Sequence, residues 1–286
     1  MIIVKLSGGL GNQLFQYALG RHLAILNRTE LKLDASQLEK PHQWPYRTFG
    51  LGEFNIAATK ATKSEIKQLI GQRNLFRRLG ELWGNRSSAY IKEPHFHFYE
   101  SVLSRKDNLY LDGYWQSEKY FLPVADLLRN DLTLKLPLSD RGQLIDKSIA
   151  QCTSVSVHVR RGDYLTRSKA NRYLRPCGLE YYHKAVDYLS QKLENPVFFV
   201  FSDDPVWAKE HLVFPFPTHH VQANAAHEDL VLMASCRHHI IANSTFSWWG
   251  AWLNPDPDKI VIAPQKWFSA ERLDTCDLLP VSWIRL

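Results

Sequence analysis

The chain has 286 residues, enough for one large domain or two medium ones with a hydrophobic core. Its net charge of +6 favours an anionic partner, but the absence of any run of five or more like charges argues against a nucleic-acid-binding protein. Four widely spaced cysteines predict reduced thiols, and no stretch approaches the roughly 20 apolar residues of a membrane span.

Residues 1–34 predict a strand, a glycine loop, a helix and a second strand. Ile2–Leu6 is a short apolar run, Ser7–Asn12 is rich in glycine, and apolar residues take helical spacing from Gln13 onward. Glu30–Asp34 has the pattern of a second strand. This order is typical of the opening of a Rossmann-like layer.

The middle of the chain, residues 36–130, has less regular patterns. Thr62–Leu69 and Ser117–Leu128 are predicted to be helices, and Leu109–Tyr114 is predicted to be a strand. Asn74–Trp83 is basic and aromatic, which is typical of a solvated helix face; contact with a membrane surface is the alternative.

From about residue 150 strands and helices alternate regularly. The predicted strands are Ser154–Arg160, Pro196–Phe201, His219–Val221, His239–Ala242 and Lys259–Ala263. The predicted helices are Leu179–Leu193, one opening at Pro205, Glu228–Ser235 and Thr245–Leu253. This alternation predicts an α/β fold with two Rossmann-like halves around a cleft, residues 1–140 and 141–286.

Polar clusters follow four of the predicted strands, at the edge where open parallel sheets bind ligands. In chain order they are Gly8–Gln13, His158–Tyr164, Ser202–Asp204 and Asn243–Ser247. Packing alone does not explain four such clusters at four strand ends. We therefore expect a ligand site there.

The clusters suit the parts of a sugar nucleotide. Arg160 and Arg161 offer forked donors that match phosphate oxygens. Ser244–Ser247 lies where a helix begins, so that hydroxyls and backbone N–H groups face an anion. Asp203 or Asp204 could accept hydrogen bonds from the N1 and N2 groups of guanine.

Each feature also has a plainer interpretation. An adjacent arginine pair is usually a solvated surface pair, and an aspartate before Pro205 can serve as a helix N-cap worth about 1 kcal/mol. The aromatic residues Trp248, Trp249 and Trp252 have the helical spacing of a core rather than of a sugar platform.

Two familiar ligand motifs are not supported. The loop GGLGNQ lacks the GxGxxG pattern of dinucleotide-binding proteins, which disfavours an oxidoreductase. Asp256-Pro257-Asp258 matches the Asp-x-Asp pattern of metal-dependent glycosyltransferases, but prolines around it predict a turn after a helix. The 12 histidines show no consistent ligand spacing, so no metal site is predicted.

The motifs taken together resemble one enzyme family. His158–Tyr164 resembles the His-x-Arg-Arg-x-Asp signature of α1,2-, α1,6- and protein O-fucosyltransferases. Asp229–Leu253, with its Asn-Ser-Thr-Phe-Ser-Trp-Trp-Gly run, is similar to the α1,2-fucosyltransferases of glycosyltransferase family 11. The opening GGLGNQLFQYALG, Gly113–Phe121 and Pro264–Phe268 are similar too, whereas Gln37–Lys106 is the least family-like part.

This resemblance implies a GT-B-like fold and an inverting transfer of L-fucose from GDP-fucose, with no metal or other cofactor. The acceptor would be the 2-hydroxyl of a terminal galactose in an oligosaccharide such as lactose or an O-antigen unit. Arg160 would hold the β-phosphate with Arg161 in support, and His158 and one of Asp203 and Asp204 would meet the guanosine. The other donor-side residues would be Asp163, Asn243, Ser244, Thr245, Phe246, Ser247, Gly9, Gly11 and Asn12, and the acceptor-side residues Gln13, Trp115 and Gln116.

Inversion also requires the acceptor hydroxyl to lose a proton. Asp34, Glu93 and Asp112 are the candidate bases, and the sequence does not single one out. A loose, oxocarbenium-like transition state could instead pass the proton late, to water or to phosphate.

Two other classes of function are compatible with the sequence. A fucosyltransferase of another linkage and a non-catalytic glycan- or RNA-binding protein are the alternatives. No secretory leader pattern precedes the first strand, so a cytoplasmic location is expected, with peripheral contact to the inner membrane left open. The oligomeric state is not predicted.

Overall fold

The computed structural model describes residues 1–39, 48–70, 89–166, 175–221, 225–269 and 274–286. The chain forms two compact units, an N-terminal unit of Met1–Lys135 with Thr275–Leu278 and a C-terminal unit of Leu136–Asp274 with Leu279–Leu286. In the described residues no helix is long and apolar enough to cross a membrane. All four cysteines are free thiols, as predicted. The basic, aromatic stretch Asn74–Trp83 lies outside the described residues.

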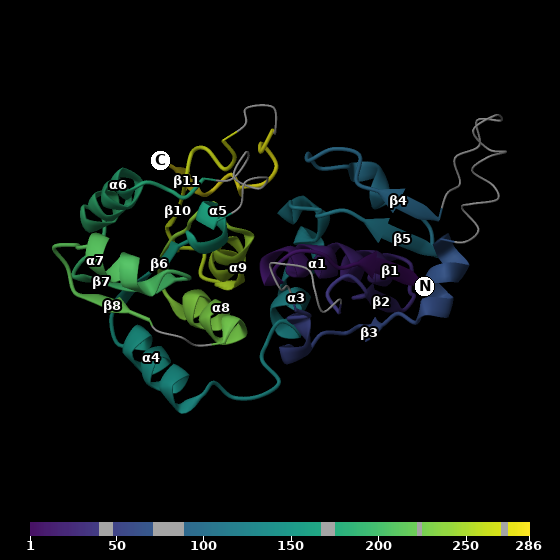
Figure 1. Cartoon of the computed structure of the whole chain (residues 1–286), viewed down its shortest axis with the longest axis horizontal. Helices are drawn as coiled ribbons and strands as arrows, with labels where there is room; N and C mark the ends of the chain where they lie inside the picture. The colour runs from purple at the N-terminus through teal and green to yellow at the C-terminus, as the bar shows by residue number, and fades with distance from the viewer. Residues whose placement is uncertain (40–47, 71–88, 167–174, 222–224, 270–273) are drawn as a thin grey trace. The chain divides into compact units, whose positions relative to one another are not determined.

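The N-terminal unit carries a five-stranded parallel sheet in the order β3-β2-β1-β5-β4 (Figure 1). Its strands are β1 (Ile2–Lys5), β2 (Leu31–Asp34), β3 (Thr59–Lys60), β4 (Tyr90–Lys92) and β5 (Leu109–Asp112). Lys5 pairs in register with Asp34, and Lys92 with Asp112, so the carboxyl ends of four strands lie side by side. Strands β3 and β4 were not predicted, because two or three residues show no period.

The helices of the N-terminal unit differ from the prediction in two places. Helix α1 (Leu10–Leu26) begins three residues before the predicted start at Gln13, with Gly9 as its N-cap. The predicted single helix Ser117–Leu128 is wrong, because Pro123 has no N–H for a continuous helix. Short helices replace it: η3 (Glu118–Tyr120), η4 (Leu122–Val124) and α3 (Ala125–Asp131). The unit also contains η1 (Leu51–Glu53), η2 (Glu100–Val102) and a helical segment at residues 63–70.

The C-terminal unit carries a six-stranded parallel sheet in the order β11-β10-β9-β6-β7-β8. Its strands are β6 (Thr153–Val159), β7 (Pro196–Ser202), β8 (Thr218–His220), β9 (His238–Ile240), β10 (Val261–Ala263) and β11 (Ile284–Arg285). Its helices are α4 (Asp140–Ala150), α5 (Gly162–Thr166), α6 (Leu179–Ser190), α7 (Pro205–His211), α8 (Ala226–Ser235) and α9 (Thr245–Leu253). The sequence predicted neither α4 nor β11.

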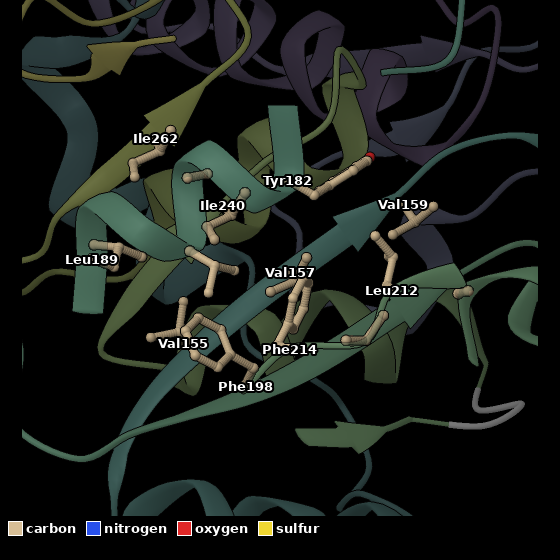
Figure 2. Close-up of a cluster of buried hydrophobic side chains, with 14 residues drawn as sticks. Val155, Val157, Val159, Tyr182, Leu189, Phe198, Leu212, Phe214, Ile240 and Ile262 are labelled. Atoms are coloured by element: carbon tan, nitrogen blue, oxygen red, sulfur yellow. The ribbon is translucent and has the colours of Figure 1, made fainter. Parts of the chain in front are cut away.

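The two faces of β6 have different chemistry because successive side chains point to opposite faces. Val155, Val157 and Val159 belong to a buried apolar cluster with Tyr182 and Leu189 of α6 (Figure 2). Ser154, Ser156 and His158 alternate with them and therefore point to the other face, where His158 meets Phe246 of α9. The strand thus ends with a polar side chain on one face and a packed core on the other.

The tryptophan-rich helix α9 is part of the core. Trp248 and Trp249 are fully buried and Trp252 nearly so, and the three rings contact one another. The interpretation of these residues as core rather than sugar platform is confirmed.

Candidate active site

The loop that follows β6 is organised by Asp203, which follows the neighbouring strand β7. The Asp203 carboxylate accepts hydrogen bonds from the backbone N–H groups of Arg161 at 2.8 Å and Gly162 at 3.0 Å. The guanidinium of Arg160 lies 3.2 Å from the same carboxylate. A Cβ atom at Gly162 would lie 2.8 Å from Asp203, so glycine permits this close contact. Both Asp203 oxygens are thus engaged by residues 160–162, which we call the arginine loop.

The Arg161 side chain contacts Asp204 and Trp207. Its guanidinium lies 3.4 Å from Asp204 and stacks over the Trp207 ring at 3.5 Å from the centroid. Asp204 is also the N-cap of α7, since it accepts a hydrogen bond from Trp207 N–H. The N-cap interpretation is therefore confirmed for Asp204, while Asp203 has a different role.

The start of helix α9 lies beside this loop within the C-terminal unit. The Tyr164 hydroxyl donates to the backbone carbonyl of Asn243 at 2.9 Å, and the Arg160 guanidinium lies 5.8 Å from the Tyr164 ring. Ser244 is the N-cap of α9 and accepts from Phe246 N–H. Backbone N–H groups at a helix start favour an anion, and here an arginine loop adjoins them.

Other predicted donor residues hold the chain around this helix start. Asn243 is buried and donates both amide hydrogens, to the carbonyls of Arg175 and Trp267. Ser247 is buried and donates to backbone carbonyls. Thr245 and Phe246 are partly exposed in the first turn of α9, where a ligand can reach them.

His158 is a buried polar side chain near the end of β6. Burial and the nearby Arg160 guanidinium lower its pKa to about 3, so the imidazole is neutral at physiological pH. Its ring lies 5.6 Å from that of Phe246, and its Nδ1 atom has no hydrogen-bond partner among the described residues. A ligand with a polar edge could satisfy that nitrogen. Asp163 lies in α5, but its side chain is outside the described residues.

The Asp-x-Asp sequence lies in an exposed turn after α9, as predicted. Asp256 N–H donates to Asn254, and Asp258 N–H donates to Asp256. The Asp256 carboxylate thus accepts a hydrogen bond within the turn that it belongs to.

The three candidate bases lie at the carboxyl edge of the N-terminal sheet, each in a different environment. Asp34 is buried and accepts from the Tyr110 hydroxyl at 2.6 Å. Asp112 is ion-paired with Lys5 at 3.0 Å. Glu93 follows β4, and burial raises its pKa although two backbone N–H groups donate to it. Asp34 and Asp112 thus each have a side-chain partner on another strand of the same sheet.

The glycine loop and the predicted acceptor residues are mostly buried or hydrogen-bonded within the protein. Gln13 is fully buried, and its amide hydrogens go to the carbonyls of Gly8 and Thr48. Trp115 is fully buried, and Gln116 donates to Asn12 Oδ1 at 2.9 Å. Gly9 caps α1 and Gly11 is buried in its first turn. Of this group, Asn12 is the side chain with partial exposure.

Sequence reasoning missed Gln16, which ties the edge of the sheet together. Its amide donates to the Ser7 hydroxyl and to the carbonyl of Gly113, each at 3.0 Å, and accepts from Ser7 N–H. A polar residue at a buried position of α1 was the available signal.

The sequence is similar to those of known glycosyltransferases. The sequence model described as Glycosyl transferase family 11 matches residues 1–286. An alpha-1,2-colitosyltransferase of Escherichia coli is 35% identical over 293 residues, covering 100% of this chain and 99% of the relative. The Escherichia coli O-antigen biosynthesis glycosyltransferase WbnK is 34% identical, covering 98% and 99%. Galactoside alpha-(1,2)-fucosyltransferase 1 of Bos taurus is 26% identical over 185 residues, 60% of this chain and 47% of that protein.

Solved structures share the fold. A mutant of Arabidopsis thaliana FUT1 in complex with GDP has a TM-score of 0.53 at 12% identity, covering 98% of this chain and 74% of that chain. POFUT1 in complex with GDP-fucose has a TM-score of 0.50 at 12% identity, covering 92% and 97%. The predicted α/β, GT-B-like class is therefore confirmed. The chain belongs to glycosyltransferase family 11.

Proposed function

We propose that this glycosyltransferase moves L-fucose from GDP-fucose to the 2-hydroxyl of a terminal galactose in an oligosaccharide, with inversion and without a metal. The observation that carries the proposal is the arginine loop after β6, held by Asp203 and adjoining the start of α9 through Tyr164. This arrangement suits a diphosphate. Relatives named as α1,2-glycosyltransferases support the linkage.

Departure of GDP is assisted by fixed positive groups in this proposal. As the glycosidic bond breaks, negative charge develops on the diphosphate, and preorganised donors stabilise that charge more than the ground state. Arg160 is such a donor, because Asp203 fixes its guanidinium while the side chain stays 22% exposed to a ligand. The N-terminus of α9 adds its partial positive charge.

The acceptor proton leaves late in this mechanism. All three candidate carboxylates are engaged by donors of the protein. Lys5 pairs with Asp112, Tyr110 and Ser36 donate to Asp34, and the backbone N–H groups of Tyr114 and Trp115 donate to Glu93. We therefore infer an oxocarbenium-like transition state in which the hydroxyl proton passes to the departing diphosphate or to water.

A second donor is favoured by one specific observation, the 35% identity to an alpha-1,2-colitosyltransferase. Colitose is the 3-deoxy counterpart of L-fucose, so GDP-colitose and GDP-fucose differ by one sugar hydroxyl. A site that hydrogen-bonds this hydroxyl rejects the deoxy sugar strongly, whereas an apolar site accepts both.

A donor panel tests the proposal. GDP release is measured with GDP-fucose, GDP-colitose and GDP-mannose, each with and without lactose. We expect lactose-dependent release from GDP-fucose and none from GDP-mannose. Faster release from GDP-colitose than from GDP-fucose would make colitose the transferred sugar, and the reaction would still be a glycosyl transfer from a GDP-sugar. Tight GDP binding by calorimetry without release would point to another acceptor or linkage, and lactose binding without GDP binding would establish a non-catalytic glycan-binding protein.

A further inference from the structure

An exposed aromatic side chain stands on a tightly held turn after β5. Tyr114 is 44% exposed, whereas the next residue, Trp115, is fully buried. The carboxylate of Glu93 accepts the backbone N–H of Tyr114 at 2.7 Å and that of Trp115 at 2.9 Å. One side chain therefore fixes the backbone on both sides of the exposed tyrosine.

The backbone of this turn is strained. Trp115 has φ of +58°, a left-handed conformation that a bulky side chain rarely adopts. Burial of its indole, which packs edge-on against Tyr120 at 5.7 Å, keeps it there. A Cβ atom at Gly113 would lie 2.4 Å from Glu93 Cβ, so a larger residue at position 113 would collide with Glu93. Strain that the surroundings hold in place is typical of binding sites.

The turn lies where a sugar could be bound. It follows β5 directly, at the carboxyl edge of the N-terminal sheet, which is the ligand-binding edge of parallel sheets. The Lys5–Asp112 ion pair at the same strand ends is 23% exposed on each side. An aromatic face suits the C–H face of galactose, and charged groups nearby suit its hydroxyls.

We propose that Tyr114 is the platform on which the terminal galactose of the acceptor stacks, and that Glu93 is the positioning residue that fixes it. This inference rests on the proposed function and deepens it. It moves the acceptor contact away from Gln13 and Trp115, because the protein buries both side chains.

The test compares Tyr114→Ala and Tyr114→Phe with the control Leu122→Ala, another exposed apolar side chain of the same unit. We expect Tyr114→Ala to raise the KM for lactose about 5- to 10-fold with kcat and GDP affinity within about twofold, since aromatic contacts have this size. Tyr114→Phe and Leu122→Ala should match the wild type. An unchanged KM in Tyr114→Ala would overturn the platform, and an equal loss in Tyr114→Phe would replace stacking by a hydroxyl contact.

Glu93→Gln separates positioning from proton transfer. The amide keeps one acceptor oxygen, so we expect the lactose KM to rise while kcat and its pH profile stay unchanged. A large fall in kcat with an altered pH profile would make Glu93 a base and overturn the positioning role. Because Glu93→Gln can misfold, circular dichroism accompanies it, and the Tyr114 variants decide the platform by themselves.

Direct binding distinguishes a failure of this inference from a failure of the proposed function. Saturation-transfer NMR with lactose needs no catalysis. Lactose signals that are clearly weaker in Tyr114→Ala than in the wild type support the platform even if no transfer from GDP-fucose is found. Equal signals in both proteins, or none in the wild type, contradict the platform whatever the donor assay shows.

Discussion

Replacing Arg160 by lysine separates the chemistry of the arginine loop from its charge. Lysine keeps the positive charge but loses the forked pair of donors that matches a phosphate. In the structure Arg160 makes an ion pair with Asp203 at 3.2 Å and lies 5.8 Å from the Tyr164 ring. The substitution therefore keeps the positive charge at this site but removes the forked pair of donors.

The expected effects on stability and on rate differ in size. The Arg160 and Asp203 side chains are 22% and 24% exposed, so solvent screens their ion pair, and its contribution is at most about 1 kcal/mol. The distant ring contact adds about 0.5 kcal/mol. Losing a preorganised donor to the departing group costs about 3 to 4 kcal/mol, on the order of 100- to 1,000-fold in kcat. Rate should thus fall far more than stability.

Three measurements on Arg160→Lys check this expectation: urea unfolding, GDP affinity by calorimetry, and kcat for transfer from GDP-fucose to lactose. The matched control is Arg129→Lys, whose partly exposed arginine also pairs with an aspartate, Asp126, at 2.7 Å. We expect the control to be indistinguishable from the wild type. A kcat for Arg160→Lys within about threefold of the wild type would refute the forked-donor argument. A loss of activity that merely follows a loss of folded protein would refute it too.

Three further outcomes follow from the same contacts. Asp203→Asn should lower the free energy of unfolding in urea by about 1 to 3 kcal/mol, because an amide nitrogen would face the N–H groups or guanidinium of the arginine loop. The control Asp256→Asn should change it by no more than about 0.5 kcal/mol. Equal changes in the two variants would contradict this. Gly8→Ala should destabilise by about 2 to 4 kcal/mol, since φ is +78° and the new Cβ would lie 2.3 Å from a side-chain nitrogen, and a wild-type unfolding midpoint would show that the loop relaxes. Burial lowers the pKa values of His158 and His239, so both stay neutral in the folded state, whereas the unfolded chain protonates them below about pH 6.5. The free energy of unfolding should therefore fall by about 1.4 kcal/mol for each histidine between pH 7.5 and 5.5. A free energy of unfolding in urea that does not change over that pH range would contradict this.

The C-terminal sheet was predictable except for its edge strand β11, because buried parallel strands appear as continuous apolar runs. Pro196–Phe201 was predicted and β7 ends one residue later, at Ser202. The N-terminal unit was harder. Its two- and three-residue strands β3 and β4 hold their places through tertiary pairing with β2 and β5, which leaves no periodic signal in the sequence.

The candidate site was predictable in its location and less so in its contacts. Strand ends indicated the arginine loop and the start of α9, because parallel strands bring their carboxyl ends to one edge. The engagement of Asp203 by Arg161 and Gly162 depends on pairing between β6 and β7, far apart in the chain. The left-handed conformation of Trp115 had no signal either, since tryptophan does not favour it.

The proposed reaction is a metal-independent transfer of fucose to the 2-hydroxyl of galactose. The most direct measurement incubates the protein with GDP-fucose and lactose in the presence of EDTA and determines the linkage of the product by NMR. We expect a fucosylated lactose with an α1,2 linkage to galactose, formed as fast with EDTA as without it. A product of another linkage would contradict the acceptor assignment, and activity that EDTA abolishes and a divalent cation restores would contradict the mechanism.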